Sequence, residues 1–205
     1  MILCDVGNSS FHFDNNGEIY TQSVETFNPS QILEDVYFIC VNPHVIGLLN
    51  GLCNWINLAD FIDMSKYYET MGIDRIIACE AVDNAIVIDA GSAITVDIVK
   101  NGCFEGGFIY PGVKAMQETY ANISSRLDYS FNFECDLDIM PKNSQDAITY
   151  GFVRTFYTEV MSHGMPIVLT GGDALKFKKI FKEAKVDKEL IFSGMKKIIQ
   201  KVQPC

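Results

Sequence analysis

The sequence is poor in positive charge. Among its 205 residues, 16 lysines and arginines stand against 26 aspartates and glutamates, which gives a formal net charge of −10. Nucleic acids and anionic membranes are bound through clusters of positive charge, so we expect neither as a main partner. A polyanionic ligand would have to be held locally, by backbone amides, metal ions and a few cationic side chains.

Histidine and paired cysteines are also scarce. The histidines, His12, His44 and His163, are not spaced from a cysteine or serine as a catalytic triad or a zinc site would need. The cysteines are odd in number and form no Cys-x-x-Cys pair. We therefore expect them to be small, buried hydrophobic residues in a reducing cytosol. There are seven: Cys4, Cys40, Cys53, Cys79, Cys103, Cys135 and Cys205.

Long apolar runs are missing as well. No run approaches the roughly 18 residues of a membrane helix, and only Met1-Ile-Leu-Cys precedes Asp5, too little for a signal peptide. We therefore predict a soluble, cytoplasmic protein.

What the sequence does contain is a distinctive pattern at residues 85–97. A short β-branched run, typical of a strand buried on both faces, ends at Asp89-Ala-Gly91-Ser92, and a second β-branched run follows. Gly91 lets backbone amides approach a phosphate, and the Asp89 carboxylate can face a cation. Taken alone, the motif is more typical of an ordinary hairpin turn.

A second copy of this pattern changes its interpretation. Residues 2–12 again contain an apolar run, Asp5-Val-Gly7, small hydroxyl residues and a resumed strand, and an Asn-Gly hairpin signal follows each copy, at 16–17 and 101–102. We infer an internal duplication. Because strands alternate with short helices, we predict an α/β fold with two domains, residues 1–84 and 85–205.

The remaining segments fit this series. We expect strands at 36–41, 54–58, 165–169 and 189–192, and a loop at 128–140. We expect a short helix that begins with Pro29, and further helices at about 43–49, 72–84, 113–124 and 145–163. Another helix is expected to begin near residue 174, and the last one spans 194–202.

Further motifs have two interpretations each. Asp74-Arg75 opens a helix after Gly72 and is either a solvated helix start or, because it links the repeats, a pair that faces a cleft between them. Gly106-Gly107, Pro111-Gly112 and Thr170-Gly171-Gly172 either pack helix on sheet or let a flat or phosphorylated ligand approach the backbone.

In chain order, Asp-x-Gly, Asp-x-Gly-Ser and Thr-Gly-Gly resemble the phosphate-1, phosphate-2 and adenosine segments of the acetate and sugar kinase, Hsp70 and actin superfamily. Within it, the chain is most similar to type III pantothenate kinases, bacterial enzymes that start coenzyme A synthesis. The resemblance covers most of the chain and rests on Asp5-Val-Gly7-Asn8-Ser9, Gly72-Ile73-Asp74-Arg75, Asp89-Ala-Gly91-Ser92-Ala93-Ile-Thr95-Val-Asp97, Gly106-Gly107-Phe-Ile-Tyr-Pro111-Gly112, Asn143-Ser144, Ala147-Ile148 and Gly151.

This resemblance implies two duplicated RNase H-like (actin-like ATPase) domains with ATP in the cleft between them. It also implies magnesium with the nucleotide, a monovalent cation (potassium or ammonium), and a homodimer whose interface helps to form the pantothenate site. The resemblance further implies that Asp89 binds the monovalent cation, that Asp5 lies near magnesium, and that Ser92 contacts the nucleotide. The implied contacts of the ATP phosphates are Asp5, Val6, Gly7, Asn8, Ser9, Ser10, Phe11 and His12.

The implied substrate residues surround the Gly72 turn. Asp74 corresponds to the catalytic base and Arg75 to a substrate contact, and a tyrosine upstream of the turn is expected to contact pantothenate; of Tyr67 and Tyr68 we favour Tyr68. The other implied contacts are Gly72, Ile73 and Ser144. Serine replaces the family's usual threonine at positions 9, 92 and 144, which retains each hydroxyl.

The implied chemistry agrees with these residue types. Phosphoryl transfer requires in-line alignment and neutralised charge more than covalent help. Asp74 is expected to accept the proton of the primary hydroxyl of pantothenate as that hydroxyl attacks the γ-phosphate, giving 4′-phosphopantothenate.

Other functions remain open at this point. They are another small-molecule kinase or a phosphatase of the same superfamily, and a non-catalytic regulatory protein on this scaffold. The acidic charge and the missing helix-turn-helix pattern argue against DNA binding, and the presence of Asp5, Asp74 and Asp89 argues against an inactive enzyme.

Overall fold

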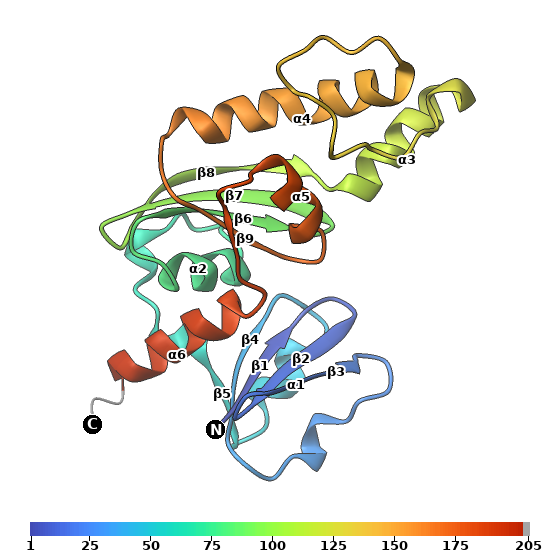
Figure 1. Cartoon of the computed structure of the whole chain (residues 1–205). Coiled ribbons are helices and arrows are strands. Elements are labelled where there is room, and N and C mark those ends of the chain that lie inside the picture. The colour runs from blue at the N-terminus through green and yellow to red at the C-terminus, as the bar shows by residue number, and fades with distance from the viewer. Residues whose placement is uncertain (203–205) are drawn as a thin grey trace. The chain divides into compact units, whose positions relative to one another are not determined.

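The computed structural model describes residues 1–202 and divides into two compact units (Figure 1). Unit 1 consists of Met1–Val82 and the C-terminal segment that begins at Glu189, and unit 2 consists of Asp83–Lys188. Each unit contains one five-stranded sheet.

The sheet of unit 1 has the strand order β3-β2-β1-β4-β5. The first three strands form an antiparallel meander, and β4 and β5 continue it in parallel with β1. The bounds are β1 Ile2–Val6, β2 Ser10–Asn15, β3 Glu18–Ser23, β4 Val36–Cys40 and β5 Trp55–Asn57.

Unit 2 repeats this arrangement. Its order is β10-β9-β6-β7-β8, with β6 to β8 antiparallel and β9 and β10 added in parallel on the other side of β6. The bounds are β6 Ala85–Ala90, β7 Ala93–Lys100, β8 Cys103–Pro111, β9 Ile167–Thr170 and β10 Lys185–Val186. The predicted α/β class and the duplicated strand pattern are therefore confirmed.

The Asn-Gly pairs form the hairpin turns that the sequence predicts. Asn16 and Asn101 both have φ of +52°, and the glycines that follow, Gly17 and Gly102, have φ of +96° and +70°. Two successive positive φ values are the signature of the turns that match the twist of antiparallel strands.

Helices complete each unit. In unit 1 they are α1 Ile46–Asn50, α2 Ile73–Glu80 and α6 Leu190–Val202, with short 3-10 turns at Pro29–Gln31, Leu58–Phe61 and Met64–Lys66. In unit 2 they are α3 Val113–Ile123, α4 Ser144–Ser162 and α5 Ala174–Ile180, with a 3-10 turn at Ser125–Leu127. Within residues 1–202, no helix has both the length and the apolar character needed to cross a membrane.

Alternation along β1 distributes its side chains between two cores. Cys4 belongs to the cluster that contains Trp55, whereas Leu3 packs with Ile39, Ile77 and the inner face of α6. Because side chains alternate along a strand, Asp5 shares the sheet face of Leu3. The carboxylate at the end of β1 therefore lies on the face that α2 and α6 cover.

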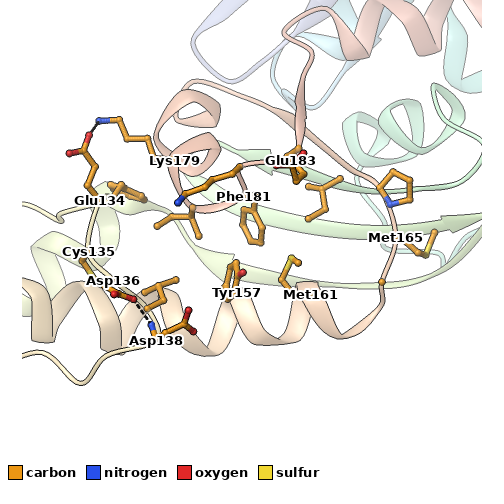
Figure 2. Close-up of a pocket in the computed structure, with 18 residues that line it drawn as sticks. Glu134, Cys135, Asp136, Asp138, Tyr157, Met161, Met165, Lys179, Phe181 and Glu183 are labelled. Atoms are coloured by element: carbon orange, nitrogen blue, oxygen red, sulfur yellow. Dashed lines mark hydrogen bonds and ion pairs between the residues drawn. The ribbon is translucent and has the colours of Figure 1, made fainter.

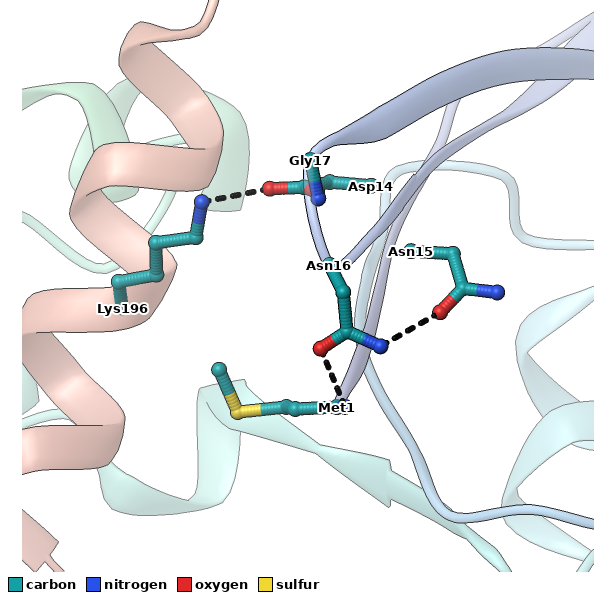
Figure 3. A network of polar contacts seen from close by, with 6 residues as sticks. All are labelled: Met1, Asp14, Asn15, Asn16, Gly17 and Lys196. Carbon is teal, nitrogen blue, oxygen red and sulfur yellow. Dashed lines mark hydrogen bonds and ion pairs between the residues drawn. The ribbon is translucent and has the colours of Figure 1, made fainter.

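An ion pair joins α6 to the first hairpin (Figure 3). Lys196 Nζ lies 2.6 Å from Asp14 Oδ2, and the backbone N–H of Gly17 donates to Asp14 Oδ1 at 2.7 Å. The Asp14 side chain is only 3% exposed. Burial by itself would raise the pKa of Asp14, but the hydrogen bonds from Lys196 and Gly17 and the charge of Lys196 outweigh it and lower that pKa.

The end of the chain differs from its prediction in two respects. The strand predicted at 189–192 is wrong, because Leu190 and Phe192 begin the buried face of α6, and the last strand is β10. The division at 84/85 placed this segment in the second domain, whereas the structure groups it with unit 1. Gly194 shows how closely α6 packs, since a Cβ there would lie 2.1 Å from the Ile77 carbonyl oxygen.

Two smaller predictions also need correction. The helix expected after Asn28 is only the 3-10 turn at Pro29–Gln31. Of the cysteines, Cys4 and Cys79 are buried as expected, but Cys53 and Cys103 are exposed. Cys205 lies outside the described residues.

Candidate active site

The β1–β2 turn contains most of the predicted ATP contacts. Its backbone is fixed from several sides: Gly7 N–H donates to Ser10 O at 2.9 Å, Val24 N–H donates to Ser9 O at 3.0 Å, and Asn42 Nδ2 donates to Asn8 O at 3.1 Å. Asn8 and Ser9 are exposed at the tip of this turn. The turn is therefore a preorganised surface that a ligand can reach.

Two predicted contacts in this turn cannot use their side chains. Val6 and Phe11 are 0% and 1% exposed and belong to the core of unit 1. Their part is to hold the turn, so any ligand contact they make is through the backbone. His12 is exposed, and its ring nitrogens lie 2.9 Å from Ser10 Oγ and 3.1 Å from Thr21 Oγ1.

The negative charge near this turn belongs to Asp5. Burial, together with the charge of Asp5, raises the pKa of the Cys4 thiol well above its ordinary value. The same two causes raise the pKa of Cys40, although a backbone hydrogen bond at Asn42 opposes them. Both thiols are therefore neutral near pH 7 and unsuited to act as nucleophiles.

In unit 2, three glycine motifs meet around Asp89. Register pairing places Asp89 opposite Thr170, and a Cβ on Gly171, whose φ is +84°, would lie 2.3 Å from Asp89 Oδ1. A Cβ on Gly112 would lie 2.2 Å from Ser92 O. Residues far apart in sequence thus form a compact cradle with a carboxylate and backbone groups, the kind of surface that receives phosphates and hard cations.

The Gly72 turn begins α2 and presents Asp74. The backbone N–H of Arg75 donates to Asp74 Oδ1 at 2.8 Å. A Cβ on Gly72 would lie 2.5 Å from the same oxygen. Glycine at position 72 therefore allows the carboxylate to occupy its place in the first turn of the helix.

Arg75 is a buried cation, only 7% exposed. Its Nη1 donates to the Tyr68 hydroxyl at 2.5 Å, and its Cζ lies 5.8 Å from the centre of the Tyr68 ring. The Tyr67 hydroxyl instead donates to Glu80 Oε1 at 2.9 Å. Of the two tyrosines considered from the sequence, Tyr68 is the one for which the structure shows an Arg75 contact.

Ser144 lies at the start of α4 and is exposed. The helix is capped by Asn143, whose Oδ1 accepts a hydrogen bond from Asp146 N at 2.9 Å. The predicted residues thus fall into two sets, with Asp5, Tyr68 and the Gly72 turn in unit 1 and Asp89, Ser92 and Ser144 in unit 2. Over residues 1–202, no three or more His, Cys, Asp or Glu side chains gather as a ready metal-binding group.

A pocket elsewhere in unit 2 is separate from these residues (Figure 2). It has a volume of about 790 Å³ and lies among the 133–138 loop, α4, α5 and the start of β9. Its charged lining contains Glu134, Asp136, Asp138 and Glu183 but only Lys179 and Lys182 on the positive side. An acidic lining does not favour a triphosphate, so this pocket does not have the charge expected of an ATP site.

Some contacts at the candidate site had no signal in the sequence. The pattern Asn42-Pro43 predicts only a helix start, yet Asn42 supports the β1–β2 turn through Asn8 O. The approach of Gly171 to Asp89 depends on the pairing of β6 with β9, which no local motif specifies.

Comparison with known proteins assigns these features to one family. The family model described as type III pantothenate kinase matches residues 54–164. A type III pantothenate kinase from Sulfurimonas denitrificans is 58% identical over 205 residues, with full coverage of both chains. Another from Campylobacter hominis is 42% identical and covers 98% of each chain.

A solved structure agrees over the whole fold. A Campylobacter jejuni protein described as a conserved putative Baf family transcriptional activator superposes with a TM-score of 0.86 at 36% identity, covering 98% of each chain. Because it is 58% and 42% identical to these two type III pantothenate kinases over nearly the whole of each chain, the chain belongs to the type III pantothenate kinase family.

Proposed function

We propose that the protein transfers the γ-phosphoryl group of ATP to pantothenate, forming 4′-phosphopantothenate in the first step of coenzyme A synthesis. Family membership supports the reaction. The structural observation that carries it is the Gly72 turn, where a carboxylate and a buried guanidinium adjoin at the start of α2.

In this proposal Asp74 is the general base. It accepts the proton of the primary hydroxyl as the hydroxyl oxygen attacks the γ-phosphorus. The hydrogen bond from the Arg75 backbone N–H to Asp74 Oδ1 supports this role, because it orients the carboxylate in the space that Gly72 leaves open. Arg75, oriented by Tyr68, binds the carboxylate of pantothenate, since guanidinium and carboxylate pair in a planar geometry.

The exposed β1–β2 turn and the Asp89 cradle are proposed to bind ATP and its cations. Carboxylate oxygens such as those of Asp5 and Asp89 suit magnesium and potassium, which prefer oxygen ligands, and they accept hydrogen bonds from ammonium. When bound, these cations neutralise phosphate charge. That help matters in a protein whose net charge is −10.

We further propose a homodimer, with a second copy helping to complete the pantothenate site. Exposed apolar side chains in unit 2 support it: Ile109 on β8 is 61% exposed and Ile123 at the end of α3 is 68% exposed. Exposed apolar surface of this kind is typical of protein–protein contacts.

A coupled assay for ADP tests the reaction. We expect ADP release from ATP only when pantothenate is present, faster in potassium than in sodium buffer, with phosphorylated pantothenate detected by mass spectrometry. Equal ADP release without pantothenate, with free phosphate as the product, would favour a phosphatase instead.

The description of the similar Campylobacter jejuni protein as a transcriptional activator favours one second candidate, a regulatory protein. An absence of any ATP turnover, together with specific retention of duplex DNA at about 0.15 M salt, would support that candidate over the kinase.

A further inference from the structure

Glu80, the last residue of α2, is the acceptor for two side chains from different parts of unit 1. The Tyr67 hydroxyl donates to its Oε1 at 2.9 Å, and Lys201 Nζ of α6 donates to its Oε2 at 2.6 Å. The Glu80 side chain is 11% exposed, whereas that of Lys201 is 61% exposed. Glu80 is therefore the inner member of this set.

Glu80 is ionised near neutral pH. Burial would raise its pKa, but the hydrogen bonds from Lys201 and Tyr67 and the charges of Lys201 and Lys66 outweigh burial and lower that pKa. An ionised carboxylate makes stronger hydrogen bonds than a neutral one. The Tyr67 hydroxyl is thus held by a charged acceptor that is itself anchored by α6.

The neighbour of Tyr67 contacts the opposite end of the same helix. Tyr68 accepts a hydrogen bond from Arg75, which lies in the first turn of α2, while Tyr67 donates to Glu80 in the last turn. The segment between them and the helix is short and turned, with Met71 N–H donating to Tyr68 O at 3.0 Å. Two adjacent tyrosines thus attach one segment to both ends of α2.

We propose that Glu80 is a positioning residue for substrate: by fixing Tyr67, it keeps the Tyr68 hydroxyl against Arg75 and orients the guanidinium toward the carboxylate of pantothenate. The inference rests on the proposed function, in which Arg75 binds that carboxylate. Arg75 donates one N–H to Tyr68, and a guanidinium carries its five N–H donors in one plane, the geometry that a carboxylate matches. Fixing its plane before binding reduces the ordering that binding requires.

Steady-state kinetics of Glu80→Gln, Tyr67→Phe and the double variant test this role. We expect each single change to raise KM for pantothenate about fivefold while kcat and KM for ATP stay within about twofold, because only preorganisation of the substrate contact is lost. The double variant should be no worse than the worse single variant, since both changes break one chain of contacts.

Glu134→Gln is the matched control. Glu134 also accepts from a lysine, at 2.8 Å from Lys179, but this pair is more exposed and lies in unit 2. We expect its kinetics to match the unaltered protein. Thermal melting of every variant reports whether the fold is intact.

Three outcomes would overturn the inference. An unchanged KM for pantothenate in Glu80→Gln would remove the role. A lower kcat and a lower melting temperature, together with higher KM values for both substrates, would indicate a merely structural contact. Fully additive effects in the double variant would show that Tyr67 and Glu80 act separately. If the unaltered protein phosphorylates pantothenate in any of these cases, the proposed function stands; if it does not, both proposals fail.

Discussion

At the residue scale, the proposed chemistry depends most on Asp74. General-base catalysis contributes about 10²- to 10⁴-fold, so Asp74→Asn should lower kcat by at least about 100-fold with little change in melting temperature. ADP release and thermal denaturation measure the two effects. Asp35→Asn, at an exposed loop position, is the control, and turnover of Asp74→Asn within about twofold of the unaltered protein would remove the role.

Gly72 permits a sharper test of where that carboxylate lies. Gly72 has φ of −62° and ψ of 140°, which alanine adopts without strain. The new Cβ would lie 2.5 Å from Asp74 Oδ1 and force the carboxylate to move. We expect Gly72→Ala to lower kcat by about 10- to 100-fold while the protein melts at or above its usual temperature.

Gly47→Ala is the comparison for this change, because nothing lies within 4 Å of a Cβ at that helical position. It should leave kcat unaltered. Normal turnover in Gly72→Ala would mean that the exact position of the Asp74 carboxylate does not matter.

Gly171 tests the cradle around Asp89. In Gly171→Ala the new Cβ would meet Asp89 Oδ1 at 2.3 Å and Ala90 O at 2.7 Å, in addition to the strain of φ +84°. Gly164→Ala has the strain alone, at φ +59° with nothing within 4 Å. We expect both to lose about 1 kcal/mol to backbone strain.

Only Gly171→Ala should, in addition, weaken activation by potassium, measured as the potassium concentration for half-maximal activity. Identical potassium titrations for the two alanine variants would contradict the proposal that Asp89 binds the monovalent cation.

At the scale of elements, the attachment of α6 through Asp14 and Lys196 (Figure 3) predicts a pH-dependent stability. The pKa of Asp14 is lowered from its ordinary value of 3.8. Its stabilisation is therefore fully present above pH 3.8 and is lost as pH falls through the lower pKa of the folded state.

Asp14→Asn should cost about 2 kcal/mol of unfolding free energy at pH 7, measured by urea denaturation, and this difference should shrink below about pH 4. Lys114→Met removes an exposed pair on α3 and should cost no more than about 0.5 kcal/mol. A difference for Asp14→Asn that grows as pH falls would contradict the assigned sign.

The helices and strands also differ in how well the sequence predicts them. Strands β1 to β3 and β6 to β8 follow from apolar runs and Asn-Gly turns, because those signals are local. The apolar run at 190–192 fits a strand or a helix, and only its packing with Gly194 against Ile77 decides for α6. Strand β10 has two residues, too few for any pattern.

The candidate site divides in the same way. The Gly72 turn and the two Asp-x-Gly turns are contiguous motifs, so spacing alone identifies them. The contacts of Gly171 with Asp89 and of Asn42 with Asn8 depend on parallel strand pairing, and that of Glu80 with Lys201 depends on helix packing. The local sequence around each of these residues does not indicate which distant residue it contacts, so these contacts could not be predicted from motifs.

At the scale of the whole molecule, the proposed homodimer predicts a sedimentation mass twice that of one chain. Ile109→Asp should shift the equilibrium toward monomer, because it places a charge on exposed apolar surface of unit 2. Leu33→Asp, at a position 86% exposed in unit 1, should leave the mass unchanged. A monomer at all micromolar concentrations would refute the dimer.

The grouping of α6 with unit 1 has a consequence for biosynthesis. The helix α6, which together with Ile77 of α2 covers Leu3 and Ile39, is translated after all of unit 2. A nascent chain leaving the ribosome therefore exposes part of that apolar sheet face to solvent until residues 190–202 emerge. Unit 2 is contiguous and can acquire its structure first, whereas the earlier-made sheet must wait, a natural opportunity for chaperones to intervene.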